Sequence, residues 1–153
     1  MKVIFLDIDG VLVNDRSLRT KRIYSLHENC DPSCVKALNR IIASTGAEIV
    51  VSSTWRTQGP LAEMREILNL HFEIDGQVLD CTPELENFSA ARHEEITAWL
   101  DHHKPSLVES FVIIDDYDNM GPLQSRLVRT REEEGLTEDD ADRAIRLLSE
   151  PVS

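Results

Sequence analysis

Short apolar runs alternate along the chain with segments in which apolar residues recur every three or four positions. The runs predict buried strands, and the wider spacing predicts amphipathic helices. The predicted strands are residues 3–8, 47–53, 111–115 and 126–130, with 78–80 as a candidate edge strand. The predicted helices are residues 31–46, near 60–72, 89–104 and 137–150. This alternation implies parallel βαβ units, and hence an α/β fold in which a Rossmann-like parallel sheet carries helices on both faces.

Residues suited to helix ends support these boundaries. Asp31 and Pro32 suit the cap and first turn of a helix that Gly46 would stop. Ser89 and Thr137 are candidate caps for the two later helices.

Polar residues follow three of the predicted strands at the point where each strand ends. The first strand is followed by Asp7 and Asp9, the second by Ser52 and Ser53, and the third by Asp115 and Asp116. Arg92 stands near the start of the helix that precedes the third strand. Ligands of doubly wound sheets bind beyond the carboxyl ends of the strands. We therefore expect four acids, a pair of hydroxyls and a cation to converge on one crevice.

Such a crevice suits phosphoryl transfer. Carboxylates from two strands form the oxygen cage that Mg²⁺ prefers. A metal ion and a guanidinium would neutralise a phosphoryl group while a hydroxyl holds its remaining oxygens. One carboxylate could then attack phosphorus, and a second could protonate the leaving oxygen and later activate water.

Four motifs in order resemble the haloacid dehalogenase (HAD) superfamily of phosphohydrolases: FLDIDGVL, IVVSS, ARHEEITAWL and FVIIDD. The resemblance implies Asp7 as nucleophile and Asp9 as acid/base. It implies Ser52 as the phosphate-binding hydroxyl, with Ser53 as the alternative, and Arg92 at a position where lysine is more usual. The implied Mg²⁺ ligands are Asp7, Asp116 and the main-chain carbonyl of Asp9, with Asp115 beside them at the substrate.

The segments VVSSTWR, RHEEITAWL and LVRTREEEGLTEDDADRAI more closely resemble the small capless HAD domains of nucleic-acid (RNA) repair proteins. Residues 14–52 and 54–92 are largely filled by predicted helices and strands, which leaves no room for a separate cap domain. The resemblance then implies an open crevice, which suits the end of a polymer, so the expected substrate is a terminal phosphate on nucleic acid, or a nucleotide as the smaller variant. The expected substrate-binding cations are a basic run, Arg16, Arg19, Lys21 and Arg22, together with Arg56.

Composition narrows the class of protein further. A chain of 153 residues is expected to form one domain, residues 1–153, with a substantial core. Its formal charge of −12 argues against a nonspecific nucleic-acid coat, and no apolar run is long enough for a membrane span. Three cysteines make no disulfide framework, so we expect a cytoplasmic protein. The resemblance implies that its partner is a phosphorylated substrate.

Three other classes of protein remain as alternatives. A two-component receiver domain also has an acidic Mg²⁺ crevice, but its early acids would be adjacent and its phosphorylated aspartate would follow a later strand. A noncatalytic interaction module on a HAD fold would show no phosphatase activity. A phosphotransferase would pass the phosphoryl group to an acceptor and release no free phosphate.

Overall fold

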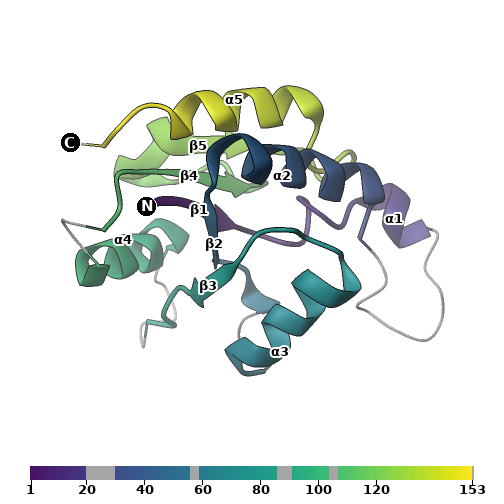
Figure 1. Cartoon of the computed structure of the whole chain (residues 1–153), viewed down its shortest axis with the longest axis horizontal. Helices are drawn as coiled ribbons and strands as arrows, with labels where there is room; N and C mark the ends of the chain where they lie inside the picture. Colours follow the sequence, from purple (N-terminus) through teal and green to yellow (C-terminus); the bar gives the residue numbers. More distant parts are fainter. Residues whose placement is uncertain (20–29, 56–58, 86–90, 104–106, 153) are drawn as a thin grey trace.

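Five parallel strands form one sheet in the order β3-β2-β1-β4-β5 (Figure 1). The structure is a computed structural model that describes residues 1–19, 30–55, 59–85, 91–103 and 107–152. The first strand lies at the centre of the sheet because it pairs with both β2 and β4. The strands are β1 (Lys2–Leu6), β2 (Glu48–Val51), β3 (Val78–Cys81), β4 (Ser110–Asp115) and β5 (Leu127–Arg129).

Helices connect the strands, as parallel pairing requires. The α-helices are α1 (Asp15–Arg19), α2 (Pro32–Thr45), α3 (Leu61–Arg65), α4 (Arg92–His103) and α5 (Glu138–Leu148). A π-helical segment, η3 (Glu66–His71), continues α3, and a 3-10 helix, η4 (Gly121–Arg126), precedes β5.

The helices cover both faces of the sheet because alternate side chains of each strand point to opposite faces. Ile4 and Leu6 of β1 join the core beneath α2 and α5, which pack against each other. Val3 and Phe5 join the core beneath α4. Figure 1 shows α2 and α5 together on one side of the sheet and α4 on the other. The predicted α/β architecture is therefore confirmed.

The predicted helix boundaries agree with the observed caps. The Asp31 side chain accepts a hydrogen bond from the Ser33 N–H at the start of α2, and Gly46 ends this helix with a φ of 70°. Thr137 and Asp140 form a reciprocal capping box at the start of α5. The expected cap Ser89 lies outside the described residues.

Three features differ from the predicted pattern, and the first is the 3-10 helix η4, for which no helix was predicted. The helix predicted near residues 60–72 is α-helical only over Leu61–Arg65 and then widens into η3. The short helix α1 was not predicted, because its five residues are too few to show a helical period.

The described residues between the sheet-edge motifs form only the elements named above, so no separate cap domain is evident in that part of the chain. None of the helices in the described ranges is both long and apolar enough to cross a membrane.

Candidate active site

The strand register places the predicted site residues in one row. Leu6 of β1 lies opposite Val51 of β2 and Ile114 of β4, so the next residues, Asp7, Ser52 and Asp115, are neighbours at the carboxyl edge. Backbone hydrogen bonds continue the pairing there, from the Asp7 N–H to the Ile114 carbonyl at 3.0 Å and from the Ser52 N–H to the Leu6 carbonyl at 2.9 Å. The convergence expected from the sequence is therefore present for these three residues.

Three carboxylates crowd together in this row. Asp7, Asp115 and Asp116 each offer an oxygen, and these oxygens lie within 4.8 Å of one another. Arg92, in the first turn of α4, contacts two of them: its Nη1 lies 2.8 Å from Asp115 Oδ2 and 3.2 Å from Asp7 Oδ1. Among the described residues no other cation forms an ion pair with the cluster, so its negative charge is only partly compensated.

This imbalance changes the acidity of Asp7. Burial, reinforced by the neighbouring Asp115 carboxylate, raises the pKa of Asp7 to about 8, although Arg92 opposes the shift. Burial also raises the pKa of Asp115 despite its contact with Arg92. A cation among these oxygens would favour their ionised forms, so the donor set and its charge fit a hard divalent metal such as Mg²⁺.

Gly10 allows Asp116 to approach the loop that follows β1. Gly10 has a φ of 79°, and a Cβ at this position would collide with the Asp116 carboxylate. The Gly10 carbonyl also accepts a 2.6 Å hydrogen bond from the buried Thr130 hydroxyl. The glycine of the first motif therefore has a steric role in placing the third carboxylate of the cluster.

The two adjacent serines are in different environments. The Ser52 hydroxyl oxygen is buried and has no hydrogen-bond partner among the residues that the structure describes. The Ser53 hydroxyl, in contrast, accepts a 3.2 Å hydrogen bond from the Trp55 backbone N–H. A buried hydroxyl without a partner is energetically costly, and a ligand oxygen would remove that cost. The geometry thus favours Ser52 over Ser53 for binding phosphate.

Asp9 lies outside the carboxylate cluster. Its side chain is exposed, and its Oδ2 accepts a 2.9 Å hydrogen bond from the indole Nε1–H of Trp55. No local sequence pattern indicates this contact, because the two residues are 46 positions apart.

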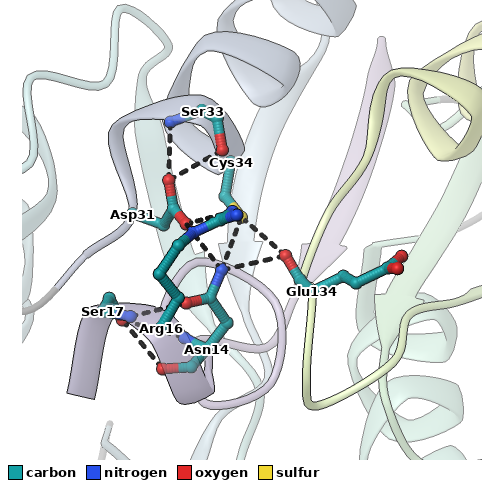
Figure 2. Close-up of polar contacts among 7 residues, drawn as sticks. All are labelled: Asn14, Arg16, Ser17, Asp31, Ser33, Cys34 and Glu134. Carbon is teal, nitrogen blue, oxygen red and sulfur yellow. Dashed lines mark hydrogen bonds and ion pairs between the residues drawn. The ribbon is translucent and has the colours of Figure 1, made fainter. Parts of the chain in front are cut away.

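A buried polar network holds the segment after Asp9 in place (Figure 2). The Asn14 side-chain amide donates to Asp31 Oδ2 at 2.7 Å and to the Glu134 carbonyl at 2.9 Å. Asp31 also accepts hydrogen bonds from Ser33 and Arg16. The network joins α1, the start of α2 and the turn that precedes α5, so the loop that carries Asp9 is anchored to the body of the domain.

The structure describes only Arg16 and Arg19 of the predicted substrate-binding cations, and these two lie in different environments. Arg16 forms an ion pair with Asp31 at 2.7 Å, so its guanidinium is engaged within the fold. Arg19 is exposed at the end of α1. Lys21, Arg22 and Arg56 lie outside the described residues.

A hollow of about 850 Å³ extends from Asp116 along the segment between β5 and α5. Arg129, Arg131 and Arg143 line it together with several acids of the 132–140 segment. Sequence reasoning assigned no role to these arginines, although they lie within the LVRTREEEGLTEDDADRAI segment. Only the packing of β5 beside β4 brings Arg129 next to the acidic row.

The parallel sheet and the acidic row at its carboxyl edge define an α/β domain of the HAD type. A model of the family described as the HAD domain in Swiss Army Knife RNA repair proteins matches residues 3–141. The chain therefore belongs to this family of HAD domains, and the resemblance inferred from its motifs is confirmed. No curated protein and no solved structure matches the chain.

Proposed function

We propose that the chain is a Mg²⁺-dependent phosphate monoester hydrolase that works through an aspartyl-phosphate at Asp7. The observation that carries the proposal is the cluster of Asp7, Asp115 and Asp116, whose charge Arg92 only partly compensates. The buried Ser52 hydroxyl without a described partner supports it, because a phosphoryl oxygen would supply the missing hydrogen bond.

The three carboxylates would hold the metal ion, with the main-chain carbonyl of Asp9 as the further ligand that the resemblance implies. When bound, Mg²⁺ would supply positive charge that neutralises the phosphoryl group. Arg92 would supply further positive charge from the start of α4, and Asp115 would keep its guanidinium in place through the 2.8 Å contact.

The reaction would proceed in two steps. A carboxylate oxygen of Asp7 attacks phosphorus, the bond from phosphorus to the leaving oxygen breaks, and Asp9 gives its proton to that oxygen. Asp9 then takes a proton from water as the water oxygen attacks phosphorus. The bond from phosphorus to the Asp7 oxygen breaks, inorganic phosphate leaves, and the Asp7 carboxylate is regenerated.

Substitution of the nucleophile tests this proposal. Hydrolysis of p-nitrophenyl phosphate should require Mg²⁺, release free phosphate and fall at least about 10³-fold in Asp7→Asn. The control is Asp101→Asn, which removes an exposed carboxylate on α4. Undiminished hydrolysis by Asp7→Asn would contradict the mechanism. A wild type that is inactive on every phosphate ester would instead favour the noncatalytic module, and transfer without free phosphate would favour a phosphotransferase.

For the substrate, we propose a terminal phosphate on nucleic acid, with nucleotides as the smaller variant. The absence of an evident cap in the described chain and the family's description as RNA repair domains support this choice. The exposed Arg19 and the exposed Arg131, which lines the hollow beside Asp116, offer cations for neighbouring phosphates.

A substrate panel tests the choice. Oligonucleotides with 3′- or 5′-phosphates should be hydrolysed faster than sugar phosphates. Neutralising Arg19, Lys21 and Arg22 together should weaken oligonucleotide turnover and flatten its salt dependence, since counterion release scales with the phosphates contacted. Neutralising Lys2 and Arg146, at the opposite edge of the sheet, should do neither. Faster turnover of sugar phosphates, or an equal loss on p-nitrophenyl phosphate in the triple variant, would contradict a polymeric substrate.

A further inference from the structure

We infer that Trp55 is a positioning residue for Asp9, and that its indole N–H determines which carboxylate oxygen carries the transferred proton. The inference rests on the proposed function, because it concerns the acid of that reaction. It assigns the proton to Oδ1 of Asp9, since Oδ2 is the oxygen that receives the indole hydrogen.

The contact joins a side chain held by packing to one exposed to solvent. The Trp55 ring packs at the edge of the main core and meets Phe72 edge to face, with ring centroids 6.1 Å apart. Its backbone N–H donates to Ser53 at the end of β2. The Asp9 carboxylate, in contrast, has the indole as its only hydrogen-bond partner among the described residues. Trp55 therefore restrains a carboxylate that would otherwise sample several rotamers.

The chemistry of the indole makes the two oxygens of Asp9 inequivalent. An indole N–H is a donor only, so Oδ2 accepts, and because a carbonyl oxygen accepts more strongly than a hydroxyl oxygen, the protonated acid is favoured with its hydrogen on Oδ1. As Oδ1 releases that proton to the leaving oxygen, Asp9 becomes an anion and the indole hydrogen bond becomes charge-assisted and stronger. Trp55 thus favours the charge that develops on Asp9 while the leaving group departs.

This role predicts a dependence on the leaving group. An alkoxide needs a proton as it leaves, whereas p-nitrophenolate is stable without one. Loss of the indole donor should therefore slow the hydrolysis of an alkyl phosphate far more than that of p-nitrophenyl phosphate. The quantity to compare is kcat/KM, because it covers the steps through departure of the leaving group and not the later attack of water.

The experiment measures kcat/KM of wild type and Trp55→Phe on glycerol phosphate and on p-nitrophenyl phosphate. We expect a loss of about tenfold or more on the alkyl ester, a fraction of the 10²–10⁴ that general acid catalysis contributes, and less than about twofold on the aryl ester. Trp99→Phe is the matched control. Its indole donates to Asp80 on β3 at 2.8 Å, so the same type of hydrogen bond is removed away from the acidic row.

Two further variants make the test specific. In an Asp9→Ala background, Trp55→Phe should cause no additional loss on the alkyl ester, because the positioned group is gone. Replacing Trp55 by benzothienylalanine removes the N–H but keeps the ring shape, so it answers the same question if Trp55→Phe does not fold.

Equal losses on both esters, an additive loss in the Asp9→Ala background, or an alkyl-selective loss in Trp99→Phe would each overturn the role of Trp55. These results all require an active wild type. A wild type with no hydrolysis of either ester would overturn the proposed function itself, so the two failures are distinguishable.

Discussion

Asp7 and Asp31 are buried to nearly the same degree, with 5% and 6% of their surfaces exposed, yet their pKa values shift in opposite directions. Burial raises the pKa of Asp7 to about 8, and the neighbouring Asp115 adds to the shift. Burial also acts to raise the pKa of Asp31, but hydrogen bonds from Asn14, Ser33 and Arg16 outweigh it and hold that pKa well below its usual value. The balance between desolvation and the donors around a carboxylate decides whether it is stable as an anion.

This difference in pKa shift distinguishes Asp31, a structural carboxylate, from Asp7, a carboxylate suited to catalysis. Asp31 receives its hydrogen bonds within the fold, where it caps α2 and binds Asn14 of the segment after Asp9. Asp7 lies beside two other carboxylates and one guanidinium, so the described residues around it keep an excess of negative charge that a bound cation would balance. Substitution of Asp31 should therefore lower stability and leave ligand binding intact. Substitution of Asp7 should change stability little and weaken ligand binding.

The largest effect on stability is expected at the structural carboxylate. Asp31→Ala should lower the free energy of unfolding by about 3 kcal/mol, because it removes an N-cap and one of the two oxygens to which the buried Asn14 amide donates. Urea unfolding followed by circular dichroism measures the change. Asp31→Asn keeps one acceptor oxygen and should lose about half as much. A loss below about 0.5 kcal/mol in Asp31→Ala would show that the network is not stabilising.

Mg²⁺ should stabilise the fold only through the cluster of Asp7, Asp115 and Asp116. At 100 times its dissociation constant, Mg²⁺ should raise the free energy of unfolding of the wild type by about 2.7 kcal/mol. Asp116→Asn should lose most of this increment, whereas Asp31→Ala should keep it. Thermal unfolding with Mg²⁺ and with a chelator measures each increment. Equal increments in wild type and Asp116→Asn would contradict the assignment of Asp116 as a ligand.

The stabilising contribution of Asp31 should depend on pH with a definite sign. Because folding lowers its pKa, the contribution is complete above the unfolded value of about 3.9 and is lost as pH falls below it. The difference in unfolding free energy between wild type and Asp31→Asn should thus be constant from about pH 8 to 5. It should then shrink by about 1.4 kcal/mol for each unit by which folding lowers the pKa. A difference that shrinks at alkaline pH would contradict this sign.

The smallest effect is expected at Asp7, where the donors do not offset burial and the repulsion from Asp115. In the metal-free protein, Asp7→Asn should lower the free energy of unfolding by less than about 0.5 kcal/mol, because the amide replaces a carboxyl that burial and Asp115 make costly to ionise. Arg92 would keep its contact with Asp115. Chemical unfolding in the presence of a chelator measures the change, and a loss as large as that of Asp31→Ala would remove the distinction between the two carboxylates.

The elements of the fold could be predicted from sequence because their patterns are local. Apolar runs, helical spacing and the caps at Asp31, Gly46 and Thr137 each depend on neighbours within a few residues. Helix α1 and the π-helical segment η3 could not be predicted, since the first is too short for a period and the second changes the period within one helix.

The sequence by itself determined the order of strands and helices and the acids and hydroxyls that follow them. Parallel pairing then brings Asp7, Ser52 and Asp115 into one row, because strands in register end together. Only the tertiary structure decided that the Ser52 hydroxyl has no partner among the described residues, that Asn14 binds the Glu134 carbonyl 120 positions away, and that Trp55 binds Asp9. These contacts depend on how distant segments pack, and no local period encodes the direction in which a side chain finds its hydrogen-bond partner.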